Sequence, residues 1–182
     1  MTQIRLTPRP VPTTKDPLKT LFFLDHAVED SGMILAGLTP GTIVKRLPRT
    51  GDALDAIASL AEIQTIPIDR IVVLSHGTPG TLRLSGRDID STALRKAEAP
   101  LGRIRAALTP KAEIVLMARA TGAGAAGRAF LRTLGIATGA TIKTADADIG
   151  GTAGRDALPA AAVPAGKTVL RTTSQPAPMR LG

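Results

Sequence analysis

The chain has 182 residues, enough for one domain with a sizeable core, and a formal net charge of +8. It contains no cysteine, which excludes disulfide bonds, thiolate metal sites and a thiol nucleophile. With two histidines in all, a His-rich zinc site is not expected either, and we expect no cofactor. Aromatic residues make up 2% of the chain, too few for the stacking platforms that bind single-stranded nucleic acid.

The basic residues are scattered one or two at a time, a distribution typical of a solvated surface rather than a nucleic-acid site. The first residues lack the apolar core of a signal peptide. No apolar run approaches the roughly 20 residues that span a bilayer. We therefore expect a soluble chain, cytoplasmic as written, or part of a secreted or surface protein if it is cut from a longer one.

Strand and helix patterns alternate through residues 19–172, which we interpret as one α/β domain between an irregular, proline-rich leader (1–18) and a flexible tail (173–182). Short apolar runs indicate buried strands, and stretches with one apolar face indicate helices. In the first half of the chain we expect strand 21–25, helix 28–38, strand 42–47, a helix capped by Asp52 and running to Gln64, and strand 71–75. The second half should contain hairpin 81–89, a helix capped by Ser91 and interrupted near Pro100, strand 114–118, helix 125–134, strand 141–144 and an edge strand at 168–172.

This alternation predicts a three-layer α/β/α fold with a mainly parallel sheet of five or six strands and a small hairpin. Sites in open parallel sheets form beyond the carboxyl ends of the strands. Three predicted strand ends carry informative residues: Asp25-His26, Ser75-His76-Gly77 and Ala118-Arg119-Ala120. On its own, a His-Gly pair after a strand is more often a hydrogen-bonded turn.

Six stretches agree with the motifs of one protein family in both their order and their spacing: FLD (23–25), LAGL (35–38), VLSHGTPG (73–80), LRL (82–84), GAAGRAF (124–130) and TGA (138–140). Over residues 20–158 the chain resembles a bacterial domain-of-unknown-function family. That family occurs near the start of very large surface proteins with cadherin-type and haemolysin-type repeats. It is similar in turn to the cysteine peptidases that include caspases and gingipains, and this implies a caspase-like α/β fold.

Those peptidases place a Ser-His-Gly motif after one strand and Gly-Cys or Ala-Cys after the next. The resemblance implies that His76 would protonate the departing amine and that Gly77 would help to hold the oxyanion. Counting back without gaps from the GAAG stretch puts Arg119 at the cysteine position, and a one-residue shift puts Ala120 there. Neither residue is a nucleophile at neutral pH.

The missing cysteine allows two interpretations. Arg119 favours natural loss, whereas a cysteine changed to alanine at position 120 to trap a complex or prevent autolysis would be engineered. We therefore expect a catalytically inactive caspase-like pseudo-peptidase that binds or assembles a protein or peptide partner. The alternative is a cysteine endopeptidase, self-processing or not, in a Cys-less variant. A third interpretation, a basic nucleic-acid-associated protein, rests on charge alone.

The remaining candidates border the same predicted edge. Asp25 would line a pocket for a basic side chain, as in the Arg/Lys-specific relatives of caspases, or would simply cap the next helix. His26 is expected to be a surface or turn residue. Asp146, with Asp148, would face the same rim or bind a cation. Arg119 would bind a carboxylate or sulfate beside the His76 loop, or would point to solvent.

Overall fold

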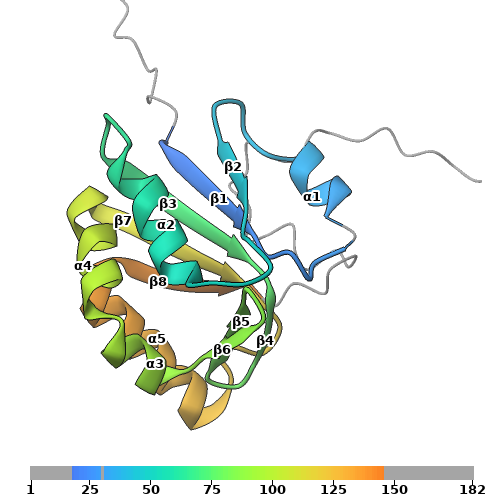
Figure 1. The fold of residues 1–182 in the computed structure, drawn as a ribbon, viewed down its shortest axis with the longest axis vertical. Coiled ribbons are helices and arrows are strands. Elements are labelled where there is room, and N and C mark those ends of the chain that lie inside the picture. Colours follow the sequence, from blue (N-terminus) through green and yellow to red (C-terminus); the bar gives the residue numbers. More distant parts are fainter. Residues whose placement is uncertain (1–17, 30, 146–182) are drawn as a thin grey trace, which may run out of the picture.

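A computed structural model describes residues 18–29 and 31–145 (Figure 1). Five strands form a parallel sheet in the order β2-β1-β3-β7-β8, and three form a small antiparallel sheet in the order β4-β5-β6. The strands are β1 (Thr20–Leu24), β2 (Ile43–Arg46), β3 (Ile68–Leu74), β4 (His76–Thr78), β5 (Thr81–Leu84), β6 (Arg87–Ile89), β7 (Leu108–Met117) and β8 (Thr141–Ala145). The helices are α1 (Gly32–Ala36), α2 (Ala53–Glu62), α3 (Ser91–Lys96), α4 (Glu98–Ala107) and α5 (Gly124–Thr138).

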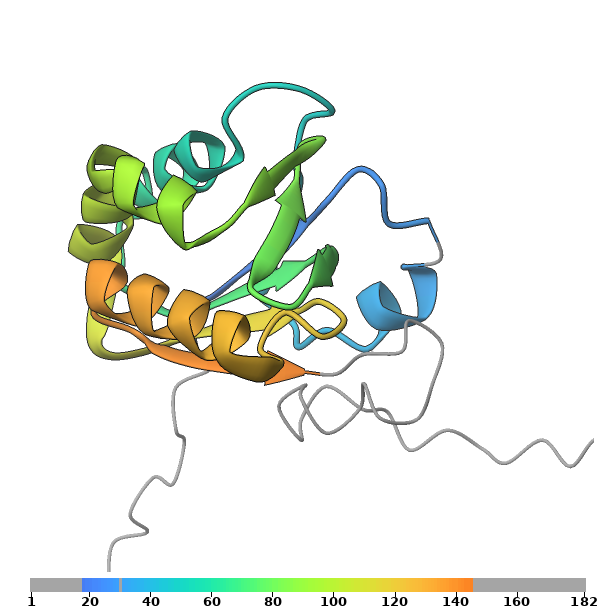
Figure 2. The ribbon, with the colours of Figure 1, turned by 90° about the horizontal axis from the view of Figure 1, so that it is seen from below.

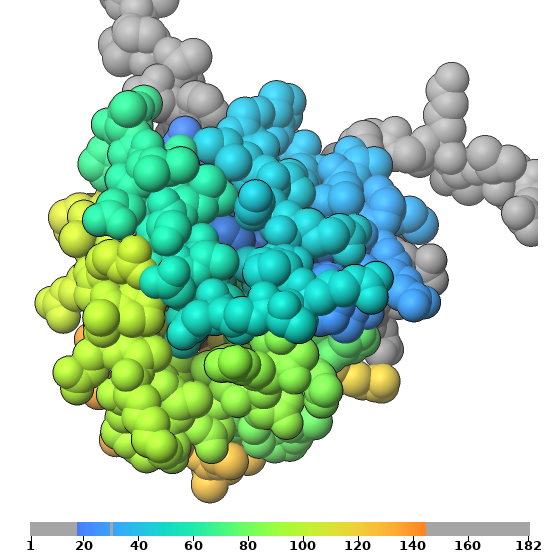
Figure 3. Space-filling model, viewed as in Figure 1, coloured from blue at the N-terminus to red at the C-terminus, as the bar shows by residue number. Residues whose placement is uncertain are grey.

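Alternate residues of the central strands face two separate apolar cores, as the two-residue repeat of a buried strand requires. One core packs Leu21, Val73 and Leu116 under α2, α3, α4 and α5. The other packs Phe22 and Met117 with the apolar residues of α1 and of the loop after it. Figure 2 shows α1 on the opposite side of the sheet from α3, α4 and α5, and Figure 3 shows α2 and α4 side by side on the outer surface. The predicted α/β fold, with a mainly parallel five-stranded sheet and a hairpin, is confirmed.

The first helix is shorter than predicted. We expected it over 28–38, but α1 spans only Gly32–Ala36. The carboxylate of Asp25 accepts a hydrogen bond from the Ala27 amide and its carbonyl accepts one from the Val28 amide, so the chain turns here before the helix begins. The side chain of Val28 is buried as part of this turn.

The helical stretch after residue 90 also differs from the prediction. Asp90, not Ser91, caps α3, because the Asp90 carboxylate accepts a hydrogen bond of 2.7 Å from the Ala93 amide. The helix breaks at Ala97, three residues before Pro100, in agreement with the predicted interruption near Pro100. Pro100 lies in the first turn of α4, where an amide has no partner within the helix and a proline costs little.

Two further differences concern the end of α5 and one additional strand. α5 runs past its predicted end at 134 to Thr138 and stops at Gly139, whose φ of +69° is the left-handed conformation that glycine adopts readily. The short strand β4 was not predicted. The predicted edge strand at 168–172 lies outside the described residues.

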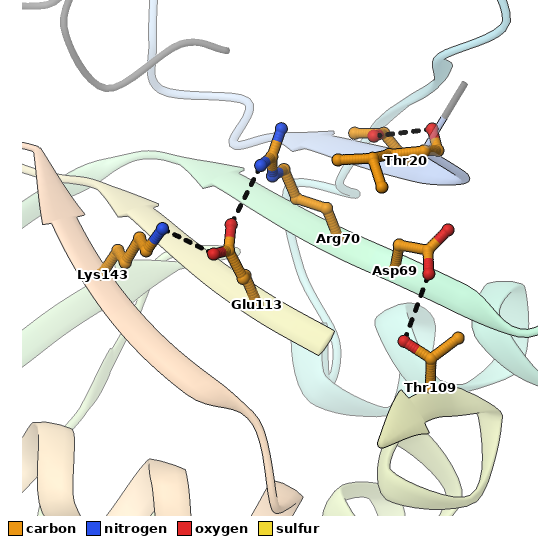
Figure 4. A network of polar contacts seen from close by, with 7 residues as sticks. Thr20, Asp69, Arg70, Thr109, Glu113 and Lys143 are labelled. Atoms are coloured by element: carbon orange, nitrogen blue, oxygen red, sulfur yellow. Dashed lines mark hydrogen bonds and ion pairs between the residues drawn. The ribbon is translucent and has the colours of Figure 1, made fainter. Parts of the chain in front are cut away.

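A polar network crosses the three strands β3, β7 and β8 (Figure 4). Glu113 of β7 accepts hydrogen bonds from Arg70 of β3 at 2.9 Å and from Lys143 of β8 at 2.5 Å. The hydrogen bond from Lys143 lowers the pKa of Glu113 below its ordinary value; burial opposes this effect, and Arg70 adds to it. Beside this group, Asp69 accepts hydrogen bonds from the hydroxyl of Thr109 and the amide of Lys19. These contacts hold the neighbouring strands in register.

We expect Glu113→Gln to lower stability at pH 7 by about 0.5–1 kcal/mol, since water screens the exposed Lys143 partner. The pKa of Glu113 is lower in the folded state than in the unfolded chain. Its ionised form therefore stabilises the fold at neutral pH, and this stabilisation is lost as the pH falls through the folded-state pKa. Urea unfolding from pH 7 downward should show wild type and variant converging in acid. Asp88→Asn, which removes a carboxylate from a more exposed 3.6 Å pair with Arg83, should have a smaller effect. A constant difference between Glu113→Gln and wild type at every pH would contradict the argument.

Candidate functional site

The parallel pairing of β3 with β7 brings the two predicted motifs to one edge of the sheet. Leu74 lies opposite Met117, and the Ser75 amide donates a hydrogen bond of 3.1 Å to the Met117 carbonyl. His76 and residues 118–120 therefore follow the ends of adjacent strands. The prediction that these segments share one edge on neighbouring strands is confirmed.

Beyond the strand ends, the two loops pack against each other through a glycine. A Cβ atom added to Gly77 would lie 2.0 Å from Thr121 Oγ1 and 3.2 Å from the Cβ of Ala118, so no larger residue fits here without movement. The fully buried Thr121 fastens the contact. Its carbonyl accepts a hydrogen bond from the Gly80 amide, and its hydroxyl donates one to the Thr81 carbonyl. These contacts make the edge a rigid junction between the two motifs.

His76 is exposed and opens β4, which continues directly from the end of β3. Its Nε2 lies 3.3 Å from the carbonyl oxygen of Ala27, in the loop that follows β1. Opposite it on β5 stands Arg83. The imidazole thus lies in solvent contact between the ends of β1 and β3.

The exposure of the side chain differs at each residue of the segment after β7. Ala118 is buried, Arg119 is exposed, and Ala120 is half-buried. Ala120 has a φ of +56°, a left-handed conformation that is uncommon for any residue with a Cβ. Its carbonyl accepts a hydrogen bond from the Ala123 amide, and α5 begins at the next residue. The tight turn places both candidate cysteine positions between the end of β7 and the start of α5.

Asp25 has a definite structural task. Its side chain is 1% exposed, and its two oxygens accept hydrogen bonds from the Ser85 amide at 2.7 Å and the Ala27 amide at 3.0 Å. Ser85 and Gly86 form the turn of the β5–β6 hairpin with φ values of +50° and +76°, as in the tight turns that suit hairpins. Asp25 therefore ties the end of β1 to a hairpin turn 60 residues away. A pocket role for Asp25 stays a prediction.

The other candidates contribute less to the described site. His26 lies in the turn after β1, as expected, with its Nδ1 3.5 Å from Asp25 Oδ1. Asp146 and Asp148 lie outside the described residues. Across residues 18–29 and 31–145, no three His, Asp or Glu side chains gather as metal ligands.

The sequence reasoning missed Thr121 and Ser85. No local signal identifies either residue, because both act through contacts about 40 or more residues away along the chain. The Ser-Gly pair at 85–86 indicated the turn but not its bond to Asp25.

We expect Gly77→Ala to destabilise the protein by about 2 kcal/mol or more, because the new Cβ overlaps Thr121 Oγ1. Denaturant unfolding measures the effect. Adding Thr121→Ala should recover part of the loss, although the Thr81 carbonyl at 3.0 Å remains close. The matched control is Gly32→Ala, where an added Cβ meets no atom within 4 Å. Equal stabilities of Gly77→Ala and Gly32→Ala would show that the two loops do not pack as described.

These features define an α/β protein with an open parallel sheet, whose candidate site lies where two central strands end beneath a small antiparallel sheet. The chain belongs to the family described as "Domain of unknown function (DUF4347)", whose model matches residues 21–158. Membership of a domain-of-unknown-function family, expected from the motifs, is therefore confirmed. No curated protein and no solved structure matches the chain.

Among the described helices, none is long and apolar enough to cross a membrane.

Proposed function

We propose that this chain is a catalytically inactive caspase-like domain that binds a protein or peptide at the edge formed by the His76 loop and residues 118–121. The resemblance noted in the sequence implies that such domains occur in large bacterial surface proteins with repeated modules. In that setting the domain would serve as a binding or assembly module. A fold alone does not assign an activity, so the proposal depends on the site.

The observation that carries the proposal is the junction of the two motifs. A caspase-like peptidase needs a thiol and an imidazole on neighbouring strand ends, where a backbone amide can also hold the oxyanion. Here β3 and β7 are neighbours, and Gly77 packs against the segment that follows β7. This neighbourhood of the two strand ends supports the proposal.

The residues at positions 119 and 120 would leave such a site without a nucleophile. The Arg119 guanidinium stays protonated and offers no lone pair, and Ala120 carries no reactive atom. A substrate-like peptide could occupy the edge without being cut. Arg119 would then hold a carboxylate of the partner, assisted by the positive end of the α5 dipole.

Introducing a cysteine tests whether the site is related to that of a cysteine peptidase. We expect Arg119→Cys to react with iodoacetamide at pH 7 roughly ten times faster than an unperturbed thiol, because an imidazole of His76 beside the thiol would favour the thiolate. Adding His76→Ala should abolish that acceleration. The rates are measured by mass spectrometry across a pH series, with Arg132→Cys on the exposed face of α5 as the control. The wild-type chain should hydrolyse peptide reporters only at background rate.

The outcome also separates the two interpretations of the missing cysteine. Acceleration in Ala120→Cys but not in Arg119→Cys would assign the lost thiol to position 120. It would then favour the endopeptidase whose cysteine was removed. If both thiols react like the control whether or not His76 is present, the caspase-like proposal fails.

Binding is tested on the wild-type chain. We expect array-selected peptides with a free carboxylate to bind in solution, measured by fluorescence anisotropy. Arg119→Ala and His76→Ala should each weaken binding about tenfold, the size of a charge-assisted hydrogen bond. Lys111→Ala, an exposed change near the opposite end of β7, should leave the affinity unchanged. Peptide binding that neither site variant weakens would contradict the proposal that the partner binds at this edge.

A further inference from the structure

Three of the helices opposite α1, namely α3, α4 and α5, carry many more basic than acidic residues. Six basic residues lie on α3, α4 and α5, against the single acidic residue Glu98: Arg95, Lys96, Arg103, Arg105, Arg128 and Arg132. Arg103 is neutralised by ion pairs with Asp55 and Glu62 of α2. The excess of positive charge is therefore concentrated on the part of the layer farther from α2.

A groove crosses this basic surface between α3 and α4 on one side and α5 on the other, which lie next to each other in Figure 2. It encloses about 480 Å³. The buried side chains of Leu94 and Leu101 lie along it, and Ile136, which is 71% exposed, stands on the α5 side. Arg95, Arg105 and Glu98 flank these apolar residues, so the rim carries two positive charges and one negative charge.

Gly102 keeps the groove open. It lies within α4, where glycine is a poor helix former, and an added Cβ would meet no atom within 4 Å. A residue with a side chain would fit the helix better but would project into the open space.

We propose that this groove docks an acidic, amphipathic segment of a partner protein, which inserts an apolar side chain beside Gly102 and places carboxylates against Arg95 and Arg105. The exposed Ile136 above the buried Leu94 and Leu101, and the net positive charge of the rim, match a segment of that kind, as in helix-in-groove recognition. A nucleic acid would use the charge but not the recessed apolar lining, and the chain has almost no aromatic residues for stacking. A membrane would favour a projecting apolar face over a hollow one. This surface is separate from the edge at His76, and its test does not depend on the function proposed for that edge.

The test fills the groove without removing any contact. We expect Gly102→Leu to fold and to unfold at a temperature about 1–4 °C higher, because leucine suits a helix better than glycine. The probe is a fluorescein-labelled, end-capped 16-residue peptide with leucines on one helical face and glutamates on the other. Wild type should bind it saturably in an anisotropy titration, and Gly102→Leu should weaken binding at least tenfold. Arg95→Glu should weaken it about as much and reduce its dependence on salt.

Two matched peptides and one control variant decide the result. Replacing the leucines of the probe by serine, or its glutamates by lysine, should abolish binding. Ile63→Ser removes an equally exposed apolar side chain at the end of α2 and should leave binding unchanged. Binding that Gly102→Leu leaves intact, or equal binding of the lysine peptide, would overturn the proposal. So would a wild type that binds only duplex DNA or phosphatidylserine vesicles, since charge alone would then account for the surface.

Discussion

The pairing of β3 with β7 is the constraint on which the site depends. These strands lie next to each other at the centre of the sheet and are buried on both faces, so a one-residue slip would send their apolar side chains to the wrong cores. Their register therefore fixes where each strand ends. Since Ser75 bonds to the Met117 carbonyl, the loops after the two strands start level with each other. The glycine at 77 then lets them meet at a distance that no Cβ would permit.

A second tie holds the small sheet over this edge. β4 and β5 continue from β3, and Thr121 already bonds to Gly80 and Thr81 at the start of β5. Asp25 adds a further anchor, because it accepts the Ser85 amide from a fully buried position at the end of β1. A buried carboxylate is costly unless its oxygens find donors, and both oxygens of Asp25 do so. The candidate site is thus enclosed by three strand ends, each fastened to the next.

The sequence predicted the layout of the fold well because the deciding signals are local. Apolar runs identified the central strands, and the apolar face after Asp52 identified α2, whose cap the structure shows. Prediction of the helix starts failed where one of several possible local hydrogen bonds decided the outcome. α1 is short because Asp25 holds a turn, and α3 starts from Asp90 because its carboxylate reaches Ala93. The candidate site was predictable as a set of strand ends, but its junction at Thr121 was not, since that contact exists only after folding.

The two proposed surfaces share a helix but lie at opposite ends of it. α5 begins just after the segment that carries Arg119, and its last turns present Ile136 to the groove. At a rise of about 1.5 Å per residue, Ile136 lies ~18 Å along the helix from Gly124. Direct electrostatic coupling between exposed groups is largely screened over that distance. A change in the groove should therefore leave the chemistry at the edge undisturbed, and each surface can be judged by its own variants. A partner that engaged both surfaces would gain affinity from linkage alone, with no change in either site.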